Sequence, residues 1–145
     1  MKKEYLIQDI NNPKYLFHGS PNKLEVIKPN LSCDSNNNKI NEDNAVFLTP
    51  IFLTATAYAF KETIKRNSCD LDWNFEINNN NIIPIMKMKN VSIDENMIGY
   101  VYVFKYKENM IKDDNSYQYK CYSNLVPIHV IEVCYKDYSC YYEIM

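Results

Sequence analysis

At least six short segments of this chain are rich in apolar, β-branched or aromatic residues, some of them in alternation, and one segment repeats its apolar residues at helical spacing. A period of two is typical of strands that bury one face, and a spacing of three to four is typical of an amphipathic helix. The expected strands are Tyr15–His18, Val46–Thr49, Trp73–Ile77, Ile82–Val91, Gly99–Tyr106, Tyr117–Tyr122, Ile128–Tyr135 and a last edge strand, Tyr138–Met145. The expected helix is Thr54–Arg66, with Thr54 as its N-cap. The pattern predicts an α+β fold with mostly antiparallel sheets and one main helix.

The size and charge of the chain limit its class. A chain of 145 residues is long enough to bury one core, and no linker or repeat divides it, so we expect a single domain over residues 1–145. The net charge of −2 lacks the basic excess that duplex DNA or anionic membranes attract, and we expect neither as a partner. No apolar run is long enough for a signal peptide or a membrane span.

The five cysteines are an odd number and have no CxxC or Cys/His spacing. Such a pattern argues against a disulfide framework and against a metal site. We therefore expect reduced thiols, a cytoplasmic protein and no bound metal.

The first expected strand ends in His18, Gly19 and Ser20, and Gly19 is one of only two glycines in the chain. Glycine lets the backbone approach a ligand closely or adopt a φ that other residues do not reach. His18 and Ser20 would then present polar side chains where the strand leaves the core. A second strand, Ala45–Pro50, leads into the helix that carries Tyr58. Together these features suggest a nucleotide-binding cleft.

The succession of His18–Ser20, Val46–Thr49 and Ala57–Ala59 resembles the ADP-ribosyltransferase superfamily. It is most similar to the poly(ADP-ribose) polymerase and RNA 2′-phosphotransferase branches, and to small bacterial proteins of unknown role. The resemblance covers Tyr15–Phe60 well and the second half loosely. It implies an ADP-ribosyltransferase-like split antiparallel sheet that holds NAD, or a related nucleotide, as substrate or ligand.

The resemblance also implies roles for individual residues. His18, Gly19 and Ser20 would bind the adenosine ribose and the nicotinamide amide. Phe47 and Tyr58 would stack on the two faces of the nicotinamide ring, where aromatic pairs gain on the order of 1 kcal/mol beyond burial. In the family, a glutamate on a later strand orients the ribose and stabilises the positive charge of the transition state.

The chain departs from the family at two of these positions. Phe47 stands where these proteins usually have a tyrosine, so the stacking surface remains and the hydroxyl is lost. Counting back from Leu125–Pro127 places Gln118 at the catalytic position, with Tyr119 as the next candidate. A glutamine can bond a ribose hydroxyl, but it cannot stabilise a developing cation as a carboxylate does. We therefore expect a protein that binds NAD or an ADP-ribosyl group and has weak or no transfer activity.

Other interpretations stay open at this point. A non-catalytic binding or interaction module would keep the fold and lack the glutamate. A 2′-phosphotransferase would need several arginines for its phosphate, and Arg66 is the only arginine among sixteen basic residues. His18 could be a strand-end histidine bonded to a backbone carbonyl, and Phe47 and Tyr58 could be core residues. The tyrosine-rich C-terminus could be a contact surface.

Overall fold

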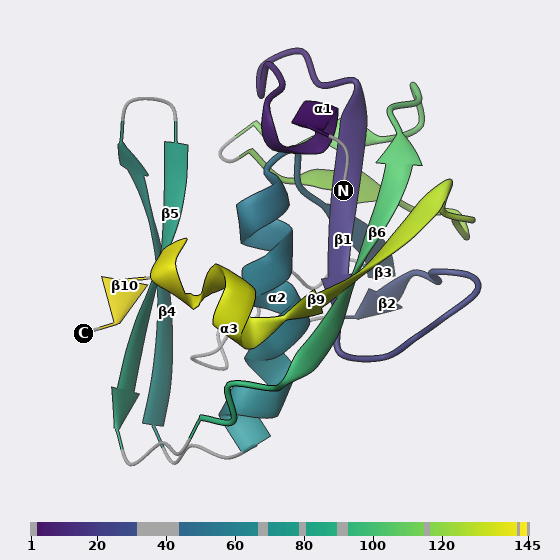
Figure 1. Cartoon of the computed structure of the whole chain (residues 1–145). Coiled ribbons are helices and arrows are strands. Elements are labelled where there is room, and N and C mark those ends of the chain that lie inside the picture. Colours follow the sequence, from purple (N-terminus) through teal and green to yellow (C-terminus); the bar gives the residue numbers. More distant parts are fainter. Residues whose placement is uncertain are drawn as a thin grey trace.

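Helix α2 (Phe52–Arg66) lies between two sheets in the computed structural model of the chain (Figure 1). The structure describes residues 3–31, 44–66, 70–78, 81–89, 93–114, 117–141 and 143–144. The sheet on one side of α2 is antiparallel, in the order β1 (Tyr15–Ser20), β6 (Ile98–Lys105), β9 (His129–Cys134). The sheet on the other side has the order β10 (Glu143–Ile144), β5 (Asn81–Lys89), β4 (Asp70–Asn78). The fold is α+β with mainly antiparallel sheets, as the sequence predicts.

A third, antiparallel sheet meets the first at one point. Its strands, in spatial order, are β2 (Asn30–Leu31), β3 (Asn44–Leu48), β8 (Tyr119–Cys121) and β7 (Ile111–Lys112). The meeting point is the pair Phe17 and Thr49, whose N–H groups each donate to the other's carbonyl oxygen, at 2.8 and 2.9 Å. The remaining elements are α1 (Lys3–Leu6), α3 (Tyr135–Tyr138) and a 3₁₀ turn, Ser139–Tyr141. No helix in the described part of the chain is long and apolar enough to cross a membrane.

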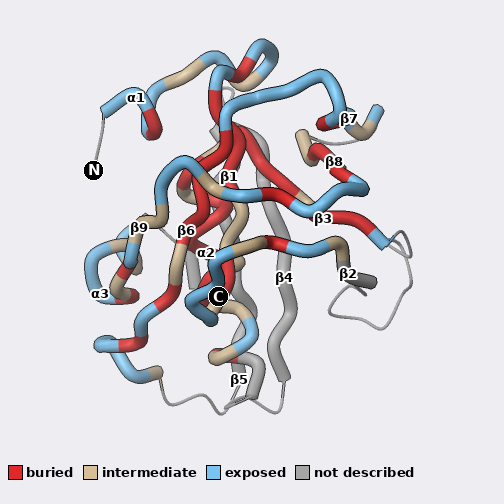
Figure 2. Tube along the Cα trace, turned by 90° about the vertical axis from the view of Figure 1, so that its right-hand side faces the viewer, coloured by how far each residue is buried: buried red, intermediate tan, exposed pale blue. Residues whose placement is uncertain are grey.

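Two apolar clusters cover the two faces of the β1–β6 pair, because successive side chains of a strand point to opposite faces. Figure 2 shows the buried positions concentrated along these strands. The cluster on the α2 side contains Phe17, Phe52, Ala55, Ala59, Phe60, Val101 and Val103. The cluster on the other side contains Leu16, Val46, Leu48, Tyr102, Phe104 and Tyr119. Position 18 of β1 shares the second face, and position 19 shares the first.

Both glycines lie where α2 packs closely on this sheet. A Cβ atom on Gly19 would overlap the carbonyl oxygen of Ala55 and lie 2.7 Å from the nitrogen of Ala59. A Cβ atom on Gly99 would lie 2.7 Å from the Cβ of Ala59. Neither glycine has a φ in the left-handed region, so of the two roles considered for Gly19 the unusual φ does not apply. Helix packing explains this glycine, because only a hydrogen fits between β1 and the backbone of α2.

Helix α2 begins at Phe52, two residues before the expected start, so the prediction of Thr54 as N-cap is wrong. Thr54 instead lies in the first turn, where it is buried. Its hydroxyl has no hydrogen-bond partner in the part of the chain that the structure describes. The ring of Phe52 packs edge-on against that of Phe17, with centroids 5.4 Å apart, and Thr49 Oγ1 accepts the N–H of Ile51. The packing of Phe52 on Phe17 and the turn at Thr49 favour a helix that begins at Phe52 and not at Thr54.

The expected edge strand Tyr138–Met145 is mostly wrong. The chain turns into α3 and the 3₁₀ turn before residues Glu143–Ile144 form β10, which pairs in parallel with β5. Tyr135, the first residue of α3, is buried, and its ring packs edge-on against Phe60 of α2 at 5.5 Å. This contact directs the chain back over α2 after β9 ends.

Candidate functional site

The side chain of His18 is held by a backbone carbonyl at the end of β1. Its Nδ1 lies 2.8 Å from the carbonyl oxygen of Phe47 on β3. A carbonyl oxygen can only accept, so Nδ1 carries the proton and donates, and Nε2 is left as the hydrogen-bond acceptor of the neutral ring. Burial lowers the pKa of His18, and the bond to Phe47 opposes this only in part. The imidazole is therefore neutral near pH 7 and able to accept a hydrogen bond from a hydroxyl group.

This lowered pKa predicts a stability loss below pH 6.5. There the unfolded chain binds a proton on the imidazole while the folded protein does not, so protonation favours unfolding as the pH falls toward the folded pKa of His18. The slope cannot exceed about 1.4 kcal/mol per pH unit for one proton. His18→Asn is the matched control, because its amide can still donate to Phe47 and does not titrate. Urea unfolding of both proteins between pH 5 and 7.5 should show the steeper loss in the natural chain, and parallel profiles would contradict the prediction.

Phe47 lies on β3 and Gln118 directly precedes β8, and both residues are half-buried. The register pairs Leu48 with Tyr119, which places Gln118 next to the junction at Thr49. The carbonyl oxygen of Gln118 accepts the N–H of Asp113 at 2.8 Å, which closes the turn between β7 and β8. Phe47 pairs with Lys120, so continuing the alternation of β8 by one residue puts Gln118 on the same outward face.

Tyr119, the other candidate for the catalytic position, points into the core. It is 4% exposed and belongs to the cluster that contains Leu48. Its ring packs edge-on against Tyr106, with centroids 6.0 Å apart. Between the two candidates, only Gln118 can contact a ligand on the outward face.

Lys120 is a neighbour of this site that the sequence reading missed. It pairs directly with Phe47 across the β3–β8 ladder, and its Nζ lies 5.9 Å from the centroid of the Phe47 ring. The sequence could have indicated Lys120, because it follows Gln118 by two residues in an expected strand and such side chains lie on one face. Its proximity to Phe47 required knowledge of the strand pairing.

Ser20 and Gly19 have structural roles in the fold. Ser20 is 8% exposed, and its hydroxyl accepts the N–H of Asn22 at 3.2 Å, which shapes the turn after β1. The hydroxyl of buried Tyr102 fixes the same turn, donating to the carbonyl of Asn22 and accepting the N–H of Leu24, both at 2.6 Å. The backbone at the end of β1 is therefore held rigidly in place.

Tyr58 is half-buried on α2, and burial raises its pKa to about 12, so its phenol is neutral at physiological pH. It precedes Ala59, the residue against which Gly19 packs. His18 points to the other face of β1, where its ring lies 6.4 Å from that of Tyr102. The structure thus joins His18 with Phe47, and Gly19 with the turn of α2 that carries Tyr58. The two groups lie on opposite faces of β1, with His18 on the side of Tyr102 and α2 on the side of Phe17.

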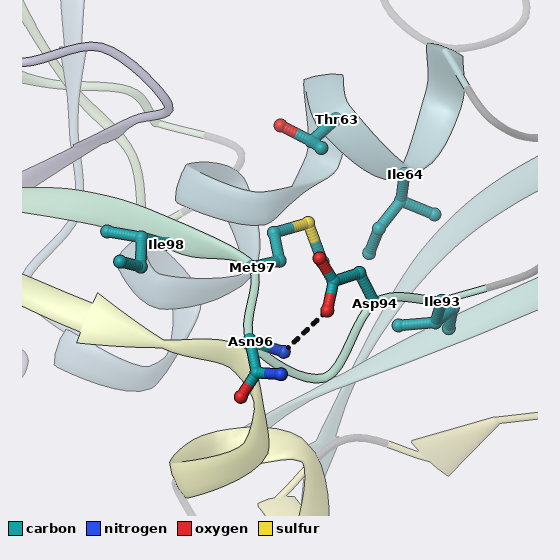
Figure 3. Close-up of a pocket in the computed structure, with 7 residues that line it drawn as sticks. All are labelled: Thr63, Ile64, Ile93, Asp94, Asn96, Met97 and Ile98. Carbon is teal, nitrogen blue, oxygen red and sulfur yellow. Dashed lines mark hydrogen bonds between the residues drawn. The ribbon is translucent and has the colours of Figure 1, made fainter.

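A pocket of about 350 Å³ lies away from these residues, between the C-terminal part of α2 and the start of β6 (Figure 3). Its lining residues are Thr63, Ile64, Ile93, Asp94, Asn96, Met97 and Ile98. The carboxylate of Asp94 accepts the N–H of Asn96 at 2.9 Å, which is a turn contact. None of the residues predicted for the site lines this pocket.

No protein-family model matches this chain. Neither the curated proteins nor the solved structures give a significant match. The likeness to ADP-ribosyltransferases therefore depends on the short motifs around His18, Phe47 and Tyr58, and a function assigned from it is a proposal.

Proposed function

We propose that this protein binds NAD or a related ADP-ribosyl nucleotide at the end of β1 and the outward face of β3–β8. We further propose that its transfer activity is weak or absent. The observation that carries this proposal is the 2.8 Å bond from His18 Nδ1 to the carbonyl of Phe47. It fixes a neutral hydrogen-bond acceptor to the backbone of Phe47, a residue with a half-buried aromatic ring, and a nucleoside offers a hydroxyl group and a flat ring to such a pair.

The neighbouring residues support the same ligand class. The Nε2 atom of His18 suits a ribose hydroxyl as donor, and the ring of Phe47 offers a stacking surface. Tyr58 adds a second half-buried ring, carried by the turn of α2 that packs on Gly19. The rigid backbone at the end of β1 would keep these groups in place without reordering on binding.

The side chain at position 118 argues against efficient transfer. Cleavage of the bond between nicotinamide and ribose builds positive charge on the ribose, and a carboxylate is the usual source of stabilisation. Gln118 offers an amide, which can orient a hydroxyl group but carries no charge. The chemistry of this residue favours a binding protein, either a weak transferase or a module that keeps the fold without the activity.

Calorimetric titration of the full chain with NAD⁺ and with ADP-ribose tests the proposal. Binding of either nucleotide, weakened by His18→Ala, would support it. A parallel assay for nicotinamide release separates the weak transferase from the non-catalytic module. No binding of either nucleotide at millimolar concentration would overturn the proposed function.

The ring of Tyr58 predicts a graded loss of nucleotide affinity. Tyr58→Ala removes the proposed stacking surface, which is worth on the order of 1 kcal/mol, or about fivefold in Kd. Tyr58→Phe keeps the ring and should bind almost as well as the natural chain. Glu62→Ala, an exposed position one turn further along α2, serves as the surface control. Equal affinities of the alanine and phenylalanine variants at position 58 would contradict stacking of the nucleotide on the Tyr58 ring.

A further inference from the structure

We infer that the pocket between the C-terminal part of α2 and the start of β6 binds a small organic cation, an ammonium group on a short apolar chain. The pocket has a volume of about 350 Å³, which lies within the range of small-molecule sites. It shares no residue with the proposed nucleotide site, so this inference does not depend on the proposed function.

The floor of the pocket is apolar. Ile64 of α2 and Met97 belong to the core cluster on the α2 side, and Ile93 packs against the same cluster. A short hydrocarbon chain laid on these side chains would leave water, which favours binding. The flexible thioether of Met97 can adapt its shape to such a chain.

Asp94 is the charged group that lines this pocket. Figure 3 shows its carboxylate directed toward Met97. The carboxylate accepts the N–H of Asn96 at 2.9 Å, and Asp94 has no ion pair within the described part of the chain. Since a carboxylate has about four acceptor positions, this one can accept further hydrogen bonds. The half-buried hydroxyl of Thr63 is a further acceptor, so a positive head group with N–H donors fits here.

The turn that carries Asp94 is held in place by backbone hydrogen bonds. The carbonyl oxygen of Asp94 accepts the N–H of Met97 at 3.0 Å. The start of α3 is bonded to the same turn, because the N–H of Tyr135 donates to the carbonyl of Met97 at 2.9 Å and that of Lys136 donates to the carbonyl of Glu95 at 3.0 Å. The carboxylate is therefore positioned before a ligand arrives, which lowers the ordering cost of binding.

The charges around the pocket determine which head group is preferred. Asp94 and Glu95 are adjacent acids, and the last turn of α2 is the negative end of the helix dipole. Lys65 and Arg66 in that turn carry the opposite charge, so the test includes an anionic probe. Because Asp94 is exposed to solvent, we expect its charge to contribute a small factor in affinity.

Three probes with the same hydrocarbon chain test the inference, namely hexylammonium, 1-hexanol and hexanoate. Titration of the full chain, followed by the NMR shifts of backbone amides, reports both the Kd and the place of binding. Hexylammonium should shift the amides of Thr63, Asn96 and Met97, and its Kd should be about two- to fivefold lower than that of hexanol. Hexanoate should bind most weakly, and the preference for the cation should shrink at high salt.

Asp94→Asn removes the charge and keeps a side-chain oxygen that can accept the N–H of Asn96. It should bring the Kd values of hexylammonium and hexanol together. Glu95→Gln is the matched control, because it removes an adjacent exposed carboxylate that does not line the pocket, and it should change their ratio less.

Three results would overturn the inference: equal Kd values of hexylammonium and hexanol for the natural chain, tighter binding of hexanoate, or no shift at the three amides. A ratio that Asp94→Asn leaves unaltered would overturn it as well. The order of the three probes in the natural chain decides the matter even if the variant does not fold.

Discussion

Gly19→Ala is expected to lower the free energy of unfolding by about 3 kcal/mol, at the upper end for overpacking a core. The added methyl group would overlap the carbonyl oxygen of Ala55 and crowd the nitrogen of Ala59. Both are backbone atoms in the middle of α2, so relief requires the whole helix to move away from β1. Equilibrium urea unfolding measures the loss, and the melting temperature should fall by roughly 6–12 °C for a chain of this length.

Gly99→Ala offers the comparison, because its methyl group would meet a side chain, the Cβ of Ala59, at 2.7 Å. The double variant with Ala59→Gly should recover part of that loss, beyond the roughly 1 kcal/mol that glycine costs within a helix. The same second substitution should not rescue Gly19→Ala. A Gly19→Ala protein with stability within about 0.5 kcal/mol of the natural chain would refute the close packing of α2.

Gln118→Glu is expected to raise the rate of nicotinamide release from NAD⁺ by about two to three decades. One well-placed electrostatic contact to the transition state is worth about 3–4 kcal/mol, and the glutamate would supply it where positive charge builds on the ribose. The substitution preserves the size and shape of the side chain, so a change in rate reports the charge. Release of nicotinamide is followed directly, with binding measured separately so that the rate is compared at saturation.

Two variants control this experiment. Gln118→Ala removes the amide without adding charge and should not accelerate release. Asp113→Asn examines a rival source of charge, because the N–H of Asp113 bonds the carbonyl of Gln118. The natural chain could instead release nicotinamide rapidly and lose this activity in Asp113→Asn. That result would show that the carboxylate of Asp113, and not the side chain at position 118, stabilises the transition state.

Runs of apolar, β-branched and aromatic residues, some of them alternating with polar residues, were sufficient to predict most strands. The expected Gly99–Tyr106 is observed as Ile98–Lys105, and the expected Tyr117–Tyr122 as Tyr119–Cys121. A period of two also assigns neighbours such as Phe17 and His18 to opposite faces without knowledge of the partner strand. The NAD ligand and the transferase resemblance stay predictions, because they depend on short motifs.

Contacts between distant segments decided what local pattern could not. The pairing of β3 with β8 brings Lys120 to Phe47, 73 positions away in the chain, and strand alternation alone cannot specify a partner or a register. Position 19 likewise requires a residue without a Cβ atom because α2 approaches β1 so closely there.

Local periodicity and residue type are enough to predict the α+β class, the positions of most strands and the chemistry that each candidate side chain can offer. Long-range packing and strand pairing set where α2 begins and which way Tyr119 points. They also bring the carbonyl of Phe47 to His18 and the ring of Phe47 to Lys120. Each of these depends on packing and hydrogen bonding between segments far apart in the chain, which no single segment encodes.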